Sequence, residues 1–202
     1  MSKILPQQFY NQKTLKVAEE LLGCFLIRKI GNKFVVSQIV ETEAYNGPND
    51  LASHASRGKT ERNGIMFGSP GNIYVYFTYG MHYMLNIVTE NEGYPAAILI
   101  RAIEPVINYF SNTNQSQIDK LSIQDYKCNG PAKLTKFLQI NKFFNGLPIY
   151  TKNHGLWIEE RKETLKSSQI KKTTRIGVDY AGEYKDKKWR FYIKENKFIS
   201  KK

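Results

Sequence analysis

Cysteine is scarce in this sequence, and long apolar runs are missing. The two cysteines, Cys24 and Cys128, form no CxxC pattern, and Cys24 lies in an apolar stretch typical of a reduced core thiol. No run approaches the roughly 18 apolar residues that span a bilayer, and the N-terminus lacks the apolar core of a signal peptide. We therefore expect a protein with no membrane partner that stays inside the cell, in the cytoplasm or nucleoid if it is bacterial.

Motifs for metals, phosphates and nucleophilic catalysis are also missing. His54, His82 and His154 show no metal-ligand spacing with one another or with a cysteine, so we expect no metal. The Gly-Ser-Pro-Gly turn at 68–71 lacks the lysine and hydroxyl residue of a phosphate-binding loop. No nucleophilic serine or cysteine motif is present.

Negative charge is low relative to positive charge. The chain has 30 Lys and Arg against 18 Asp and Glu, which gives a net charge of +12. A polyanion is the natural partner of such a chain, and nucleic acid is the commonest one. The alternative is a basic surface that is simply solvated. The same two interpretations apply to the late basic cluster of Lys185, Lys187, Lys188 and Arg190.

The pattern of elements predicts an α+β fold. Leu15, Ala18, Leu21 and Leu22 recur at helical spacing and predict a helix over 14–22. Further segments are assigned by the same reasoning: strands at 24–30, 33–45, 72–79, 82–89, 96–103, 156–159, 175–178 and 189–193, a helix at 131–138, and a polar loop with a short helix at 109–126. No linker divides the 202 residues, so we expect a single domain over 1–202.

Alternation along the second strand brings carboxylates together. It assigns Ile39, Glu41, Glu43 and Tyr45 to one face, and Val36, Val40 and Thr42 to the other. Either glutamate of this pair could activate a water molecule as a general base. The alternative is a pair of solvated glutamates near a strand end, which is the usual state of such residues.

An arginine ends the apolar run over 96–100, within the strand predicted over 96–103. Arg101 in such an element is rarely buried unless it is paired, and a carboxylate is its natural partner. We therefore predict an ion pair between Glu43 and Arg101.

Tyrosines surround the turn at Gly80. Core packing is the simplest interpretation of Tyr74, Tyr76 and Tyr83, because tyrosine favours strands. Tyr79 lies beside the turn, where an aromatic ring in a basic protein is a candidate wedge between base steps. The flat rings of Tyr45 and His54 are candidates to stack on an extruded base.

Blocks of residues that carry a resemblance occur in order along nearly the whole chain, at 38–45, 47–48, 52–54, 62–63, 66–67, 70–71, 74–76, 79–81, 86–87, 101–105, 129–134, 140–141, 175–178, 181–183 and 190–192. Together they resemble the alkyladenine (methylpurine, 3-methyladenine) DNA glycosylase family. The segment 108–126 matches nothing specific. So many ordered blocks are far more specific than one short motif.

The resemblance implies a fold and a reaction. Members have a single mixed domain with a curved antiparallel sheet, flanking helices and a protruding β-hairpin that enters the minor groove. They flip alkylated or deaminated purines (3-methyladenine, 7-methylguanine, hypoxanthine) out of duplex DNA and hydrolyse the N-glycosidic bond. They leave an abasic site, need no cofactor, and are expected to act as monomers.

The resemblance also implies roles for individual residues. Glu43 becomes the general base and Arg101 its partner, with Glu41 in support. The remaining assignments are Tyr45, His54 and Tyr76 as the stacking walls of the base pocket, Asn86 as its floor, where a guanine amino group is rejected, and Tyr79 as the intercalating residue. Two alternatives from other classes are a non-catalytic damaged-DNA-binding protein and a carbohydrate hydrolase that uses Glu41 and Glu43 as a carboxylate pair.

Overall fold

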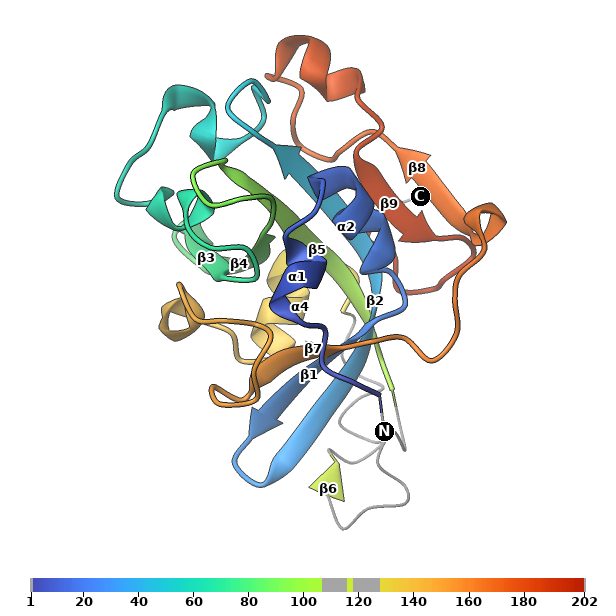
Figure 1. Ribbon diagram of the computed structural model, residues 1–202. Helices are drawn as coiled ribbons and strands as arrows, with labels where there is room; N and C mark the ends of the chain where they lie inside the picture. Colours follow the sequence, from blue (N-terminus) through green and yellow to red (C-terminus); the bar gives the residue numbers. More distant parts are fainter. Residues whose placement is uncertain (1, 107–115, 118–127, 202) are drawn as a thin grey trace.

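The computed structural model describes residues 2–106, 116–117 and 128–201. Within these residues the strands form one nine-stranded sheet that curls around a core, and the helices are short (Figure 1). The main path runs β3-β4-β5-β2-β1-β7, while β9 and β8 join it through β2. The strands are β1 (Phe25–Ile30), β2 (Lys33–Asn46), β3 (Ile73–Thr78), β4 (His82–Val88), β5 (Ala96–Pro105), β6 (Ser116–Gln117), β7 (Leu156–Glu159), β8 (Ile170–Thr173) and β9 (Arg190–Ile193). The α-helices are α1 (Gln7–Tyr10), α2 (Thr14–Glu20) and α4 (Pro131–Phe137).

The strongest local signals of the sequence are confirmed. The helix expected over 14–22 is α2, and the glycine that follows it, Gly23, has the left-handed φ of +83° that ends many helices. The first hairpin joins β1 to β2 through Gly31 and Asn32, with Ile30 opposite Lys33. The α+β class with a curled antiparallel sheet is likewise confirmed, whereas the boundary 1–202 of one domain remains a prediction.

The main core lies on one face of the central strands. Val17 and Ala18 of α2, Leu134 of α4, and Ile98 and Ile100 of β5 are all fully buried in one cluster. Alternation leaves the intervening residues of β3, β4 and β5 on the opposite face. That second face holds the candidate site.

A pair of irregularities changes which residues face the core at the centre of the sheet. Between β2 and β5 the register passes from Ile39 opposite Ile103 to Thr42 opposite Ile100, and it leaves Val40 and Arg101 without a directly opposed residue. Such β-bulges redirect side chains and are common beside active sites. Strict alternation along β2 was therefore wrong for Ile39, which joins the core, while Glu41 and Glu43 share the other face as predicted.

The predicted strand at 175–178 is also wrong. This segment is a loop: Gly177 has a φ of +75°, and Arg175 is buried in an ion pair. The strand lies earlier, at β8, where exposed lysines hide the alternation that would have predicted it. Apart from β6, the loop expected at 109–126 lies outside the described residues.

Candidate active site

Two glutamates of β2 and an arginine of β5 form a buried ionic cluster. Glu41 and Glu43 are fully buried, and Arg101 is 7% exposed. The Nε of Arg101 donates to Glu41 Oε1 and its Nη1 donates to Glu43 Oε2, and each of these hydrogen bonds is 3.1 Å long. The predicted Glu43–Arg101 pair is confirmed, and the interpretation of the glutamates as solvated is wrong. Opposite charges at hydrogen-bonding distance offset the cost of removing each group from water.

Glu43 has further donors on both carboxylate oxygens. The main-chain N–H of Ile176 donates to Oε1 over 2.7 Å, and the Tyr45 hydroxyl donates to Oε2 over 3.0 Å. Burial nevertheless raises the pKa of Glu43 above its usual value, and the nearby Arg101 charge only partly opposes this shift. A carboxylate with a raised pKa accepts a proton more readily near neutral pH.

A cavity of about 340 Å³ lies on this face of the sheet, in the size range of small-ligand pockets. The predicted site residues that line it are Tyr45, His54, Tyr76, Tyr79, Asn86 and Arg101. Glu43 is not among the lining residues. Its three donors, Tyr45, Arg101 and Ile176, all line the cavity, so the carboxylate lies directly behind the wall.

Aromatic rings cluster on the β3 side of the cavity. The His54 and Tyr76 rings meet edge to face, with centroids 4.6 Å apart. A hydrogen bond of 3.0 Å between His54 Nδ1 and the Tyr74 hydroxyl holds the imidazole against β3. Partial burial, together with the Arg62 charge, lowers the pKa of His54 and so favours the neutral ring.

Asn86 of β4 lines the same cavity and is 4% exposed. Its amide nitrogen donates to the main-chain oxygens of Tyr74 and Met84, at 3.1 and 3.3 Å. These bonds hold the side chain in one orientation. A fixed polar side chain of this kind is suited to discriminating between ligands that differ by one polar group.

The β3–β4 hairpin carries an exposed apolar tip. Tyr79 is 84% exposed and Met81 is 68% exposed. The backbone of Tyr79 has a φ of +52°, a conformation uncommon for residues other than glycine. The sequence predicted this position for Tyr79, beside the turn at Gly80. The insertion of this hairpin into DNA remains a prediction.

Comparison with known proteins identifies the group to which this fold and cavity belong. Residues 8–197 match the family described as methylpurine-DNA glycosylase (MPG). The chain belongs to this family. It is 46% identical over 201 residues to a protein of Carboxydothermus hydrogenoformans, covering 98% of this chain and all (100%) of the relative. It is 44% identical over 199 residues to a protein of Methanocella arvoryzae, covering 98% and 96% of the two chains. Both relatives are named "Putative 3-methyladenine DNA glycosylase".

The protein is therefore a DNA glycosylase, a hydrolase of N-glycosyl bonds that binds DNA, and the predicted family is confirmed. Neither alternative function class agrees with this membership. The carbohydrate-hydrolase alternative also conflicts with the geometry. Two of the groups that donate to Glu41, Arg190 and Ser200, do not line the cavity, whereas all three donors to Glu43 do, so Glu41 lies away from the cavity and does not form a catalytic pair with Glu43.

Two arginines of the glycosylase site were missed or misread in the sequence. Arg175 forms a fully buried ion pair with Asp50, with Nη2 2.8 Å from Oδ1, and its guanidinium lies 4.8 Å from the centre of the Tyr45 ring. Arg190, which was grouped with the exposed basic cluster, is 4% exposed and donates to Glu41 over 2.9 Å. The rule that indicated Arg101, an arginine inside an apolar strand, would also have indicated Arg190.

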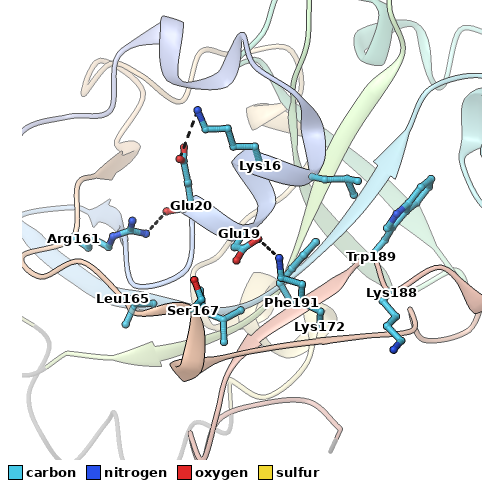
Figure 2. Close-up of a pocket in the computed structure, with 12 residues that line it drawn as sticks. Lys16, Glu19, Glu20, Arg161, Leu165, Ser167, Lys172, Lys188, Trp189 and Phe191 are labelled. Atoms are coloured by element: carbon cyan, nitrogen blue, oxygen red, sulfur yellow. Dashed lines mark hydrogen bonds and ion pairs between the residues drawn. The ribbon is translucent and has the colours of Figure 1, made fainter.

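A second cavity of the glycosylase, of about 500 Å³, lies between α2 and the β8–β9 pair (Figure 2). The acidic side chains that line it are already paired: Lys172 with Glu19 at 2.7 Å and Lys16 with Glu20 at 3.9 Å. All four are partly exposed, and ion pairs of this kind contribute little. This cavity has no buried polar group comparable to Glu43.

The described residues contain neither a cluster of metal-ligating side chains nor a membrane-spanning helix. In the part of the chain that the structure describes, no three His, Cys, Asp or Glu side chains are grouped as metal ligands would be. No described helix is long and apolar enough to cross a membrane.

Proposed function

We propose that this glycosylase removes alkylated or deaminated purines, such as 3-methyladenine, 7-methylguanine and hypoxanthine, from duplex DNA. It acts as a monomer, without a cofactor, and leaves an abasic site. One observation carries the proposal: the buried Glu43–Arg101 pair lies directly behind the wall of a cavity lined with aromatic rings.

Extrusion of the base is the first step. The net charge of +12 favours binding to phosphates, which positions the duplex without reading its sequence. Tyr79, exposed at the hairpin tip, enters the minor groove and fills the space that the flipped nucleotide leaves. Its left-handed backbone supports this role, because strain of that kind concentrates at functional positions.

The flipped purine then occupies the cavity. Tyr45, His54 and Tyr76 all line it, and their rings stack on the base. Methylation at a ring nitrogen gives the purine a positive charge, and aromatic faces attract cations. Asn86, held by its two main-chain partners, rejects the amino group of an undamaged guanine.

Glu43 carries the chemistry. It accepts a proton from a water molecule whose oxygen attacks C1′ of the sugar, while the electrons of the C1′–N bond leave with the base. Oε2 of Glu43 already accepts from the Tyr45 hydroxyl and from Arg101, whereas among the described residues Oε1 accepts from the Ile176 N–H alone, so Oε1 is the oxygen that takes the proton of the water. A positively charged methylated base needs little further activation as a leaving group, so for these bases activation of the water is the main contribution of the enzyme.

The test compares wild type with Glu43→Gln on duplexes that contain 7-methylguanine or hypoxanthine. Single-turnover excision is measured from alkali-labile abasic sites, and binding from an uncleavable abasic analogue. Loss of a general base costs about a hundred- to ten-thousand-fold in rate. We expect that loss with binding retained. Glu92→Gln, the same change at an exposed carboxylate that accepts from Ser69, is the control and should match wild type.

Near-wild-type excision by Glu43→Gln would remove Glu43 from the mechanism. A wild-type protein that binds damaged duplex but releases no purine would favour the non-catalytic alternative. The sedimentation coefficient, measured with and without duplex DNA, tests whether the protein acts as a monomer.

A further inference from the structure

The segment that follows β9 contacts the ionic cluster of the candidate active site. Ser200 donates its main-chain N–H to Glu41 Oε2 over 2.6 Å and its hydroxyl to Glu41 Oε1 over 2.8 Å. The same hydroxyl accepts from Arg101 Nη2 over 3.3 Å. Ser200 is therefore bonded both to Glu41 and to the arginine that binds Glu43.

The 196–201 segment is itself anchored on the sheet. Asn196 donates to Glu104 of β5 over 2.7 Å, and Ile199 is buried. The main-chain oxygen of Lys201 accepts from Arg190 Nη1 over 2.9 Å, and the same nitrogen donates to Glu41. The segment thus has attachments on β5 and β9, on either side of β2, the strand that bears Glu41.

All three nitrogens of the Arg101 guanidinium have a partner: Nε binds Glu41, Nη1 binds Glu43 and Nη2 binds Ser200. A planar guanidinium with three fixed partners has one orientation. We propose that Ser200 is a positioning residue of base excision, which holds Arg101 and Glu41 so that Nη1 stays on Glu43. This proposal rests on the proposed function. Ser200 lies beyond residue 197, where the match to the family ends.

Removal of the Ser200 hydroxyl has a defined consequence. Ser200→Ala takes away the partner of Arg101 Nη2 and one donor to Glu41, and it keeps the main-chain bond. The charged and titratable groups that face Glu43 are Arg101 from β5, Tyr45 and Glu41 from its own strand, and Tyr76 from β3. Only Arg101 among them favours the ionised carboxylate by its charge, so a loosened Arg101 makes Glu43 harder to ionise.

We expect Ser200→Ala to slow single-turnover excision of 7-methylguanine by roughly three- to tenfold, the scale of one hydrogen bond. The acid limb of the rate profile, measured from about pH 5 to about pH 8, should move to higher pH. Affinity for a duplex with an abasic analogue should stay unchanged. Ser200→Thr, which keeps a hydroxyl, should restore both the rate and the acid limb.

Ser69→Ala is the matched control, because it also removes a hydroxyl that donates to a glutamate, Glu92, far from Glu43 in the chain. Thermal unfolding is measured for each variant, and Ser200→Cys replaces Ser200→Ala if the latter does not fold. The proposal would be overturned if Ser200→Ala left the excision rate and the acid limb unchanged. It would also be overturned if the excision rate fell by the same factor at every pH and in proportion to the loss of thermal stability. The proposed function fails on separate results: if the wild-type protein releases no damaged purine, or if Glu43→Gln releases it at nearly the wild-type rate.

Discussion

Arg101 binds Glu43 across two neighbouring strands, with Nη1 3.1 Å from Oε2 and both side chains buried. The residue directly opposite Glu43 on β5 is Leu99, so the contact is diagonal. It becomes possible because Arg101 lies at the irregularity between β2 and β5. The pair is thus a product of the sheet's local geometry as much as of the two residue types.

The raised pKa of Glu43 predicts the pH dependence of excision. The base works only as the carboxylate, so the rate falls as pH drops through the pKa of Glu43. Because burial raises that pKa, the acid limb should lie at higher pH than a free glutamate would give. A 7-methylguanine duplex is the suitable substrate, since its base is already cationic in the acidic range.

The variant Tyr45→Phe tests this cause. It keeps the ring but removes the hydroxyl that donates to Glu43 over 3.0 Å and helps keep the pKa down. The acid limb of the rate profile should therefore move to still higher pH, while affinity for the duplex changes little. An acid limb at the same pH in Tyr45→Phe and wild type would show that it reports another group.

Arg101→Lys should keep a positive charge but lose function. An ammonium cannot bond Glu41, Glu43 and Ser200 at once in the plane that the guanidinium provides. We expect slower excision by at least tenfold, and a lower melting temperature because buried carboxylates lose partners. Lys133→Arg, an exposed position on α4, is a control for general effects of exchanging the two cations. Wild-type kinetics in Arg101→Lys would show that a positive charge at residue 101 is enough for excision, without the geometry of the guanidinium.

The sequence predicted which residues lie close together at the candidate site better than it predicted the register of the strands that carry them. Alternation and pairing rules are local, so they brought Glu43 and Arg101 together and placed Tyr79 beside the turn. They assume an unbroken strand, and the irregularity at Val40 depends on which residues of β5 lie opposite, which one strand cannot indicate. The buried role of Arg175 depends on Asp50, 125 residues away, and no local pattern shows such a partner.

Arg175→Met should destabilise the protein by about 3–5 kcal/mol, because it leaves Asp50 buried without its cation. Arg175 also lies against the Tyr45 ring and the Trp189 ring, with its guanidinium about 5 Å from each centre (4.8 and 5.0 Å). Denaturant unfolding measures the loss. In the double variant Asp50→Asn with Arg175→Met no charge stays unpaired, and the amide oxygen still accepts from one of the main-chain N–H groups that Asp50 binds, those of Asn46 and Ala52, so part of the stability should return. If the double variant is no more stable than the single one, the ion pair is not the cause.

Tyr79→Ala should impair extrusion of the base rather than cleavage of the bond. Without the ring, nothing fills the space left in the duplex, so the flipped state is less populated. Unstacking costs a few kcal/mol and costs least for weakly paired bases. The loss in single-turnover rate should therefore be larger for hypoxanthine in a well-matched pair than for hypoxanthine in a mismatch.

The left-handed backbone of Tyr79 requires a control, because alanine at a φ of +52° is strained and can alter the turn itself. Tyr79→Asn also removes the ring, but asparagine tolerates this conformation. Equal losses in the alanine and asparagine variants, with recovery in Tyr79→Phe, would assign the effect to the ring. If the loss were the same on paired and mismatched substrates, Tyr79 would not act in extrusion, and its 84% exposure would need another explanation.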